Sequence, residues 1–239
     1  MTDDQRWRKA QAYERDHWRA VASSTEPDLA WYRQRAERLC ARLATLAPEL
    51  APEHYRVLEV GGGPVGTVTF MPGEVLHAID PLADFYTCNP HLTRLRRQGV
   101  TYQQGAGESL PYEGGRFNVV VIENVIDHTG NPEQVLREIR RVLEVNGMLY
   151  LTVNVHTLWG CAVRRMMEVF QLDRGHPHTY TPTLARGLIE RGGFQILSER
   201  VEDFEAAKAK ERKVRRLRNE VKIGLGIFDV LYEVYARSP

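Results

Sequence analysis

The glycine-rich segment 61–66 (GGGPVG) follows directly on the apolar, β-branched stretch 56–60. Glycine lets the backbone approach a ligand closely and adopt positive φ angles. In an open α/β sheet, ligands bind at the carboxyl ends of the strands, where this turn lies. Gly61, Gly63 and Gly66 also match the GxGxxG pattern of dinucleotide sites, which is weakly specific when it stands alone. The segment therefore predicts a nucleotide-type cofactor site.

Two acidic residues near this segment narrow the choice of cofactor. Glu59 stands two residues before the first glycine, where a carboxylate would repel a pyrophosphate but could meet the cationic amino end of an amino-acid-like cofactor. Pro64 removes a backbone donor that a pyrophosphate would need. Asp80 ends the next predicted strand, about twenty residues on, where a carboxylate can accept hydrogen bonds from a ribose diol. The alternative is a tight turn with a capping acid, which does not account for both acids together.

The catalytic candidates are His128 and, beside it, Asp127, just past the predicted strand 117–122. Histidine titrates near neutral pH and can take a proton from a hydroxyl or an amine. The alternative for His128 is a packing role at the start of the next helix, and Asp127 also suits a loop or capping acid. Four more side chains could surround an acceptor near the same edge: His156, His176, His178 and Tyr180. No metal site is expected, because the sequence has no HxxxH pair with matched carboxylates.

These residues need a parallel sheet to bring them together. Short β-branched runs alternate with helical stretches, which is typical of a sheet covered by helices on both faces. The predicted strands of this part are 56–60, 75–79, 100–103, 117–122 and 148–153. A helix capped by Asn131 and stopped by Asn146-Gly147 is predicted between the last two.

The two ends of the chain lack this regular alternation of β-branched runs and helical stretches. Residues 1–55 predict two helices ahead of the domain 56–239, and the family resemblance given below implies that they form an N-terminal lid over it. The aromatic and titratable residues of this lid are Trp7, Tyr13, His17 and Trp18, of which the tryptophans could equally be core contacts. After a helix that opens at Thr181-Pro182, the sequence predicts strands at 194–201 and 225–236 with a charged helix at 202–222 between them. The basic run of that helix is expected to face solvent, although it could bind RNA, an acidic carrier protein or a phosphorylated acceptor.

Composition limits the class of protein. The 239 residues carry 32 Lys and Arg against 31 Asp and Glu, so that no global field steers the chain to nucleic acid or to an anionic membrane, and only a local patch could do so. The three cysteines Cys40, Cys88 and Cys161 stand far apart, which favours a reducing compartment. The charged N-terminus lacks the features of a secretory signal and no stretch is apolar enough to span a membrane, so a cytoplasmic protein is expected.

The ordered set of these segments resembles the class I S-adenosylmethionine-dependent methyltransferases over residues 56–201. LEVGGGPVG is similar to that family's first motif, VLHAID to its second, GAGESLPY to the segment that lines the adenine, and 117–153 to its fourth strand, fourth helix and fifth strand. The resemblance implies a Rossmann-like, mostly parallel seven-stranded sheet. It also implies a site for S-adenosylmethionine formed by Glu59, Gly61, Gly62, Gly63, Asp80, Pro81, Gly107, Glu108 and Glu123. Val65 and Ala106 depart from the family pattern, where a glycine and an aspartate are common.

The resemblance implies methyl transfer to an oxygen or nitrogen of a small molecule, such as a natural-product or sugar-type acceptor. Two other readings stay open. One is a nicotinamide-dependent oxidoreductase, and the other is a non-catalytic cofactor-binding partner of another enzyme. Neither nucleic acid nor a membrane is expected as a partner, and the sequence leaves the oligomeric state open.

Overall fold

The computed structural model describes residues 3–23, 31–169, 177–213 and 217–239 of the chain. They build a seven-stranded sheet with the strand order β3-β2-β1-β4-β5-β7-β6. Its strands are β1 (Arg56–Val60), β2 (Val75–Asp80), β3 (Val100–Gln104), β4 (Phe117–Glu123), β5 (Leu143–Val155), β6 (Gln195–Val201) and β7 (Val230–Arg237). β7 runs antiparallel to both of its neighbours, and the other pairings are parallel. The predicted mostly parallel, seven-stranded sheet is confirmed.

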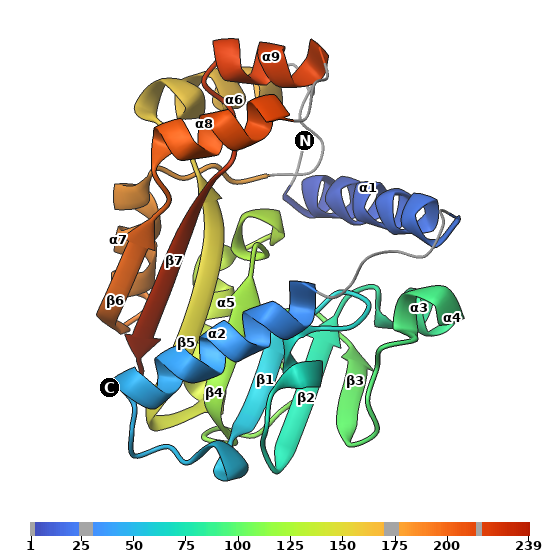
Figure 1. Ribbon diagram of the computed structural model, residues 1–239, viewed down its shortest axis with the longest axis vertical. Coiled ribbons are helices and arrows are strands. Elements are labelled where there is room, and N and C mark those ends of the chain that lie inside the picture. Colours follow the sequence, from blue (N-terminus) through green and yellow to red (C-terminus); the bar gives the residue numbers. More distant parts are fainter. Residues whose placement is uncertain (1–2, 24–30, 170–176, 214–216) are drawn as a thin grey trace.

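Helices cover both faces of the sheet (Figure 1). α2 packs on one face, and α5 and α7 pack on the other. The helices are α1 (Asp3–Ser23), α2 (Trp31–Leu46), α3 (Ala83–Thr87), α4 (Pro90–Thr93), α5 (Pro132–Val142), α6 (Leu158–Val169), α7 (Pro182–Arg191), α8 (Phe204–Lys213) and α9 (Leu217–Gly224), with short 3-10 turns η1 (Pro52–His54), η2 (Thr67–Phe70) and η3 (Ile126–His128). Within the described residues, no helix is long and apolar enough to cross a membrane.

The connection from β1 to β2 contains only the short turn η2. α2, which precedes β1 in the chain, takes the place of a crossover helix on this face. Its Leu39 and Leu43 are fully buried in one cluster with Val57, Val119 and other strand residues. The glycine segment therefore leads into a single 3-10 turn, which has no long helix behind it to supply a strong dipole.

The helix that begins at Asn131 ends earlier than predicted. The Asn131 side chain accepts a hydrogen bond from the Gln134 amide at 3.0 Å, as a capping residue does. α5 ends at Val142, however, and Leu143 already pairs with Phe117 in the sheet. Asn146 lies within β5 at a φ of 64° and donates its amide proton to the carbonyl of Ser238. The turn residues predicted to stop the helix thus belong to a bend in the strand.

The C-terminal part also differs from the sequence-based prediction. The charged segment expected as one helix over 202–222 forms two helices, α8 and α9. The final strand begins at Val230 rather than at 225, because α9 continues to Gly224 and a turn follows it. Gly226 adopts a φ of 69° in this turn, a conformation that interrupts a strand.

Candidate functional site

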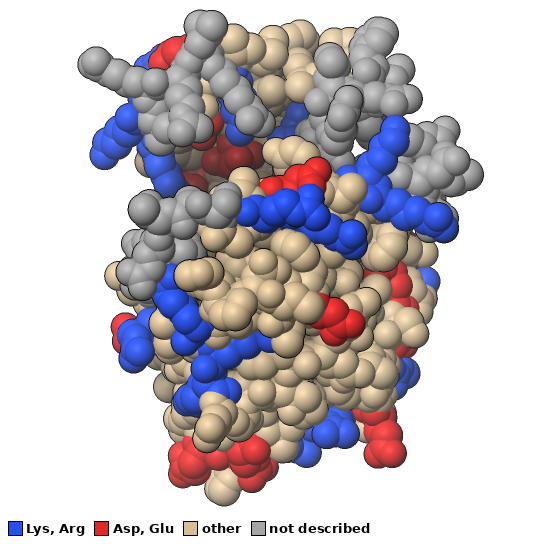
Figure 2. Space-filling model, turned by 90° about the vertical axis from the view of Figure 1, so that its right-hand side faces the viewer, with Lys and Arg blue, Asp and Glu red and all other residues tan. Residues whose placement is uncertain are grey.

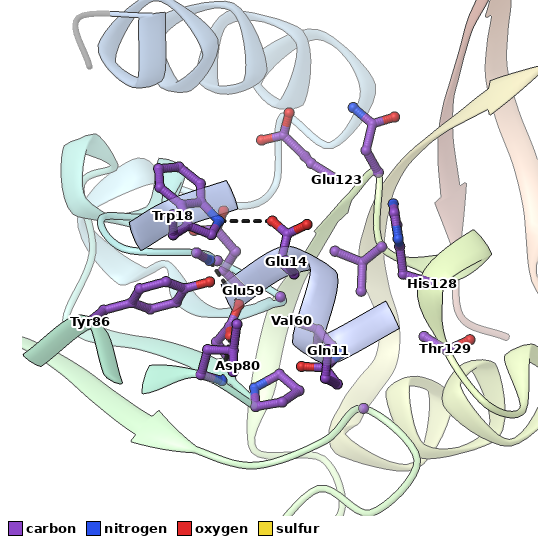
Figure 3. Close-up of a pocket in the computed structure, with 18 of the residues that line it drawn as sticks. Gln11, Glu14, Trp18, Glu59, Val60, Asp80, Tyr86, Glu123, His128 and Thr129 are labelled. Atoms are coloured by element: carbon purple, nitrogen blue, oxygen red, sulfur yellow. Dashed lines mark hydrogen bonds between the residues drawn. The ribbon is translucent and has the colours of Figure 1, made fainter. Parts of the chain in front are cut away.

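A cavity lies at the carboxyl ends of β1, β2 and β4, beneath α1 (Figure 3). It encloses about 1120 Å³ of empty space, its open mouth included, which suits a cofactor-sized ligand. Asp80, Tyr86 and Trp18 lie toward one end of it in Figure 3, and Glu123 and His128 lie toward the other. Every glycine and acid predicted for the cofactor lines this cavity, as do Pro81 and His128.

The glycine segment approaches its surroundings too closely for side chains. Gly61 has a φ of 72°, and a Cβ atom there would lie 2.3 Å from Cγ2 of Val125. Gly63 has a φ of 62°, and a Cβ atom there would lie 3.2 Å from the Tyr32 hydroxyl. Because left-handed φ angles and close contacts both exclude larger residues, these positions require glycine. The segment forms a backbone wall against which a flat, polar ligand can lie.

The Glu59 side chain is hydrogen-bonded to the 3-10 turn η2, which follows the glycine segment. Its carboxylate oxygens accept hydrogen bonds from the amides of Thr67, at 3.0 Å, and Val68, at 2.8 Å. Burial, together with the nearby charge of Glu123, raises the pKa of Glu59 to about 8. Glu59 therefore holds η2 against β1 and also lines the cavity. Its contact with the amino end of a cofactor stays a prediction.

Asp80 braces the glycine segment from the end of β2. Its Oδ2 atom accepts a hydrogen bond from the Gly63 amide at 3.0 Å, and its Oδ1 atom accepts one from the Leu82 amide at 2.8 Å. Burial raises the pKa of Asp80 to about 6, against the lowering effect of these two amides. Each carboxylate oxygen has a further lone pair, so the residue can still accept hydrogen bonds from a ribose diol.

Glu108 links two walls of the cavity. Its Oε1 atom accepts hydrogen bonds from the amides of Gly130, at 2.8 Å, and Asn131. It thereby fastens the segment after β3 to the residues that follow His128. Gly107 packs closely beside it, since a Cβ atom there would lie 3.0 Å from Val60 Cγ1.

Glu123 forms an ion pair that the sequence did not reveal. Arg35 of α2 places its Nη1 atom 2.7 Å from Glu123 Oε2, and the Thr67 hydroxyl donates to Oε1 at 2.6 Å. Burial raises the pKa of Glu123, while Arg35 opposes this shift. Arg35 is the single Lys or Arg that lines the cavity in the described part of the chain. Nothing in the sequence distinguishes it from the other arginines of the same helix.

One face of α1 closes the cavity from above. Its side chains at this face recur at helical spacing: Trp7, Ala10, Gln11, Glu14 and Trp18. The Trp18 indole donates to Glu14 Oε1 at 2.7 Å and packs edge-to-face on Tyr86 (Figure 3). Trp7 and Trp18 thus face the cavity, whereas Tyr13 and His17 of the expected lid are exposed. Glu14 and Gln11 were not predicted, although their spacing from Trp7 and Trp18 is the signal that could have identified them.

The two catalytic candidates lie in different surroundings. His128 lines the cavity, next to Thr129. Asp127 is 3% exposed and does not line it. The Asp127 Oδ2 atom lies 3.8 Å from His128 Nε2, close enough for the carboxylate to stabilise a positive charge on the imidazole. The structure thus places Asp127 behind His128 and away from a bound molecule.

The two other candidate histidines that the structure describes, His156 and His178, do not line the cavity. His156 is buried, and its Nδ1 atom lies 3.0 Å from the Phe228 carbonyl oxygen. His178 places Nε2 3.0 Å from the Thr129 carbonyl oxygen, so it supports the segment next to His128 from behind. His176 lies outside the described residues. Within the described residues, no three His, Cys, Asp or Glu side chains are grouped as a metal site requires.

Comparison with known proteins agrees with this geometry. Residues 58–151 match the family model of a methyltransferase domain. A 2-methyl-6-phytyl-1,4-hydroquinone methyltransferase of rice (Oryza sativa subsp. japonica) is 32% identical over 117 residues, 46% of this chain and 34% of that protein. A sarcosine/dimethylglycine N-methyltransferase of Halorhodospira halochloris is 27% identical over 68% of this chain and 59% of its own length. The aligned region thus spans less than two thirds of either relative.

The fold is shared with solved methyltransferase structures. Phosphoethanolamine N-methyltransferase 2 of Haemonchus contortus, solved with S-adenosyl-L-methionine, superposes with a TM-score of 0.59 at 16% identity. The superposition covers 85% of this chain and 52% of that one. The match of residues 58–151 to a methyltransferase domain, the seven-stranded sheet and the glycine-lined cavity at its carboxyl edge are consistent with the class I S-adenosylmethionine-dependent methyltransferase family.

Proposed function

We propose that this protein binds S-adenosylmethionine in the cavity and transfers its methyl group to an oxygen or nitrogen of a small molecule. The observation that carries the proposal is the joint placement of the glycine segment, Asp80 and the 107–108 segment around one cavity of suitable size. The residues fit the cofactor, because Gly61, Gly62 and Gly63 line the cavity without side chains that would enter it. When bound, the cofactor supplies a methyl group already activated on a sulfonium, so the protein's main task is positioning.

The two ends of the cavity suit the two ends of the cofactor. Asp80 would accept hydrogen bonds from the ribose, with Tyr86 and the 107–108 segment beside it to enclose the adenine. At the other end Arg35 would meet the carboxylate of the amino-acid part, since it is the single cationic Lys or Arg side chain that lines the described cavity. Glu123, and Glu59 once a bound cation favours its ionised form, would add negative charge near the position of the amino group and the sulfonium.

The acceptor would meet the methyl group near His128. The imidazole can take a proton from an acceptor hydroxyl or ammonium, and the buried Asp127 carboxylate behind it stabilises the charged imidazole. α1 excludes water from the cavity by covering it with Trp7, Gln11 and Trp18. Removal of water strengthens the electrostatic interactions within the site.

The named relatives suggest which acceptors to test. One is described as a hydroquinone methyltransferase and another as a sarcosine/dimethylglycine N-methyltransferase. An aromatic hydroxyl compound and a small amine are therefore reasonable first acceptors. Either can fit beside the aromatic side chains Trp7 and Trp31, which line the cavity with His128.

The deciding experiment is calorimetric titration of the purified chain with S-adenosylmethionine, S-adenosylhomocysteine and NAD. We expect saturable binding of the first two and no binding of NAD, because no long helix follows the glycine segment to receive a pyrophosphate. Formation of S-adenosylhomocysteine is then measured with hydroquinones and N-methylated glycines as acceptors. Binding of NAD alone would overturn the proposal. Cofactor binding without turnover, across acceptors of both classes, would favour the non-catalytic alternative.

A further inference from the structure

Three helices form a separate structure beyond the carboxyl ends of β5 and the start of β7 (Figure 1). They are α6, α8 and α9, which we call the cap. α6 follows β5, while α8 and α9 lie between β6 and β7. α6 and the end of α9 approach at backbone distance, because a Cβ atom on Gly160 would lie 2.2 Å from the Gly226 carbonyl oxygen. A Cβ atom on Gly226 would in turn lie 3.3 Å from Trp159.

The cap exposes large apolar side chains. Within the described residues, four of the nine exposed large hydrophobic side chains lie on the cap, and a fifth directly follows α9: Leu158 (82% exposed), Trp159 (64%), Met166 (57%), Val221 (53%) and then Leu225 (37%). Leu158, Ala162 and Met166 recur every four residues, so they form one stripe along α6. Trp159 continues this stripe toward Leu225 through its contact with Gly226. Exposed apolar clusters of this kind mark interaction surfaces.

The same cap concentrates positive charge. The described side chains of α6, α8 and α9 include seven Lys and Arg against three Glu, in a chain whose net charge is +1. Arg212 and Lys213 of α8 are exposed, and Lys210 keeps 80% of its side chain exposed. On α6, Arg165 is exposed next to Met166. On the face drawn in Figure 2, basic and acidic side chains both occur, separated by uncharged surface.

Acidic groups of the cap reduce this charge only in part. Asp229 pairs with Arg164 and Lys222, and Glu211 also lies 3.7 Å from Lys222. Glu205 lies 3.5 Å from Lys208. Lys210 lies 4.0 Å from Glu202 and its side chain stays 80% exposed, and Arg212 and Lys213 are exposed on the same helix.

We propose that the cap is a docking surface for an anionic lipid bilayer. Trp159, Leu158 and Met166 would enter the interface between headgroups and acyl chains, where tryptophan is favoured. The surrounding Lys and Arg side chains would attract anionic headgroups. Single-stranded RNA would also attract the basic residues, but it gives no reason for the exposed aliphatic side chains of α6 and α9.

This docking would bring the bilayer to the edge of the sheet where the cavity lies, because both features stand at the carboxyl end of the parallel strands. A lipid-dissolved acceptor would then be near the site. The docking itself does not depend on the proposed methyl transfer, and it is tested without any acceptor.

The test is sedimentation of the full chain with vesicles of phosphatidylcholine alone or with one third phosphatidylglycerol. We expect binding to the anionic vesicles, weakening as salt is raised. The double variants Leu158→Ser/Trp159→Ser and Lys210→Glu/Lys213→Glu should each lose at least about tenfold in affinity. Two matched controls lie away from the cap: Val145→Ser, at an apolar residue that is 73% exposed, and Arg137→Glu, at an exposed arginine of α5. Both should bind as the unaltered chain does, and thermal melting verifies that every variant is folded.

A spectroscopic measurement separates insertion from surface attraction. Lipids brominated in the acyl chain should quench the fluorescence of the unaltered chain. Trp159→Phe should keep vesicle binding yet lose this quenching, because the other tryptophans lie on α1 and α2. The proposal is overturned if the unaltered chain ignores anionic vesicles at low salt, or if the cap variants bind as well as the controls. It is overturned equally if the cap residues instead govern binding to single-stranded RNA, or self-association seen by light scattering, with no vesicle binding.

Discussion

Arg35 and Glu123 are 88 positions apart in the chain and are joined by an N–O contact of 2.7 Å at the cavity wall. The Glu123 side chain is 7% exposed and the Arg35 side chain 30% exposed. Because α2 precedes the sheet in the chain and Glu123 ends β4, this ion pair holds α2 against the centre of the site. It also balances one of the carboxylates gathered around the cavity.

Replacing Arg35 by methionine should lower the free energy of unfolding by about 2–3 kcal/mol, because Glu123 is left buried without its cationic partner. The loss is below that of a fully buried pair, since Arg35 is partly exposed. Arg42→Met, at an exposed arginine of the same helix, should change stability by less than about 0.5 kcal/mol. Urea denaturation measures both. If Arg35→Met/Glu123→Gln does not recover part of the loss, the pair is not coupled as described.

Replacing Gly63 by valine should abolish cofactor binding in a folded protein. Valine at a φ of 62° costs about 1–2 kcal/mol of stability, and its branches would occupy the cavity. Gly115→Val is the matched control, because Gly115 has a φ of 68° and open space around its Cβ position. Gly115→Val should lose stability from the backbone conformation alone, and Gly63→Val somewhat more, because its Cβ atom also meets the Tyr32 hydroxyl. Of the two folded variants, only Gly63→Val should fail to bind in calorimetry. Normal binding by Gly63→Val would place the cofactor elsewhere.

Asp80 should make cofactor affinity depend on pH. Burial raises the pKa of the free carboxyl to about 6, and hydrogen bonds from a ribose favour its ionised form. Affinity should therefore be full above pH 6 and fall as the pH drops below it, with proton release on binding. Asp80→Ala should weaken binding by about 2–3 kcal/mol at pH 7.5.

The matched variant for this effect is Asp80→Asn, which keeps an accepting oxygen but does not titrate. It should lose less affinity than Asp80→Ala and show a flat profile between pH 5 and pH 7.5 in calorimetry. A profile as steep as that of the unaltered chain would assign the pH dependence to another group.

Glu59 should make the ligand-free protein less stable as the pH rises. Its pKa in the folded protein, about 8, is higher than its ordinary value of 4.5. Between these values the folded state holds a proton that the unfolded state has lost, so the stabilisation present below pH 4.5 disappears as the pH passes through 8. This group alone can contribute a slope of up to about 1.4 kcal/mol per pH unit.

Glu59→Gln tests this slope, because glutamine does not titrate. The variant loses one hydrogen bond to η2. Even so, the difference in the free energy of unfolding between the variant and the unaltered chain should change as the pH rises from 4.5 to 8, because only the unaltered chain loses stability from Glu59. Urea denaturation at pH 5, 6.5 and 8 gives the comparison. Parallel profiles would show that Glu59 is ionised throughout.

His128 is expected to act as a proton acceptor in methyl transfer. His128→Ala should lose roughly 10²–10⁴-fold in turnover with cofactor affinity nearly unchanged. His128→Gln keeps a hydrogen bond without accepting a proton. Turnover restored by glutamine would make His128 a positioning residue, whereas unchanged turnover in both variants would remove it from the reaction.

The sequence predicts the parts of this site that depend on local pattern. In a parallel sheet, the carboxyl ends of neighbouring strands lie at the same edge. The topology therefore brings together the glycines that follow Val60 and the carboxylate of Asp80 at the end of the next strand. The position of Arg35 does not follow from the topology, because it depends on how α2 lies across the sheet. The same holds for Glu14, whose approach to the cavity depends on the orientation of α1.

Element boundaries were less predictable where two patterns compete. Leu143 continues the apolar stripe of α5, yet pairing with Phe117 draws it into β5. In the charged C-terminal segment, helical composition runs through 202–222, and no local signal indicates that it divides into two helices. Val221, an apolar residue of this segment, is 53% exposed.

The placement of α2 has a consequence for the order in which the chain can fold. This helix is synthesised before any strand, yet its apolar face belongs to one cluster with Val119 and with Tyr235 of the last strand. Arg237 likewise bonds to Glu49 and to the Leu46 carbonyl at the end of α2. The core on this face is therefore complete only after β7 has left the ribosome. Until then, the apolar face of α2 lacks part of its packing partners.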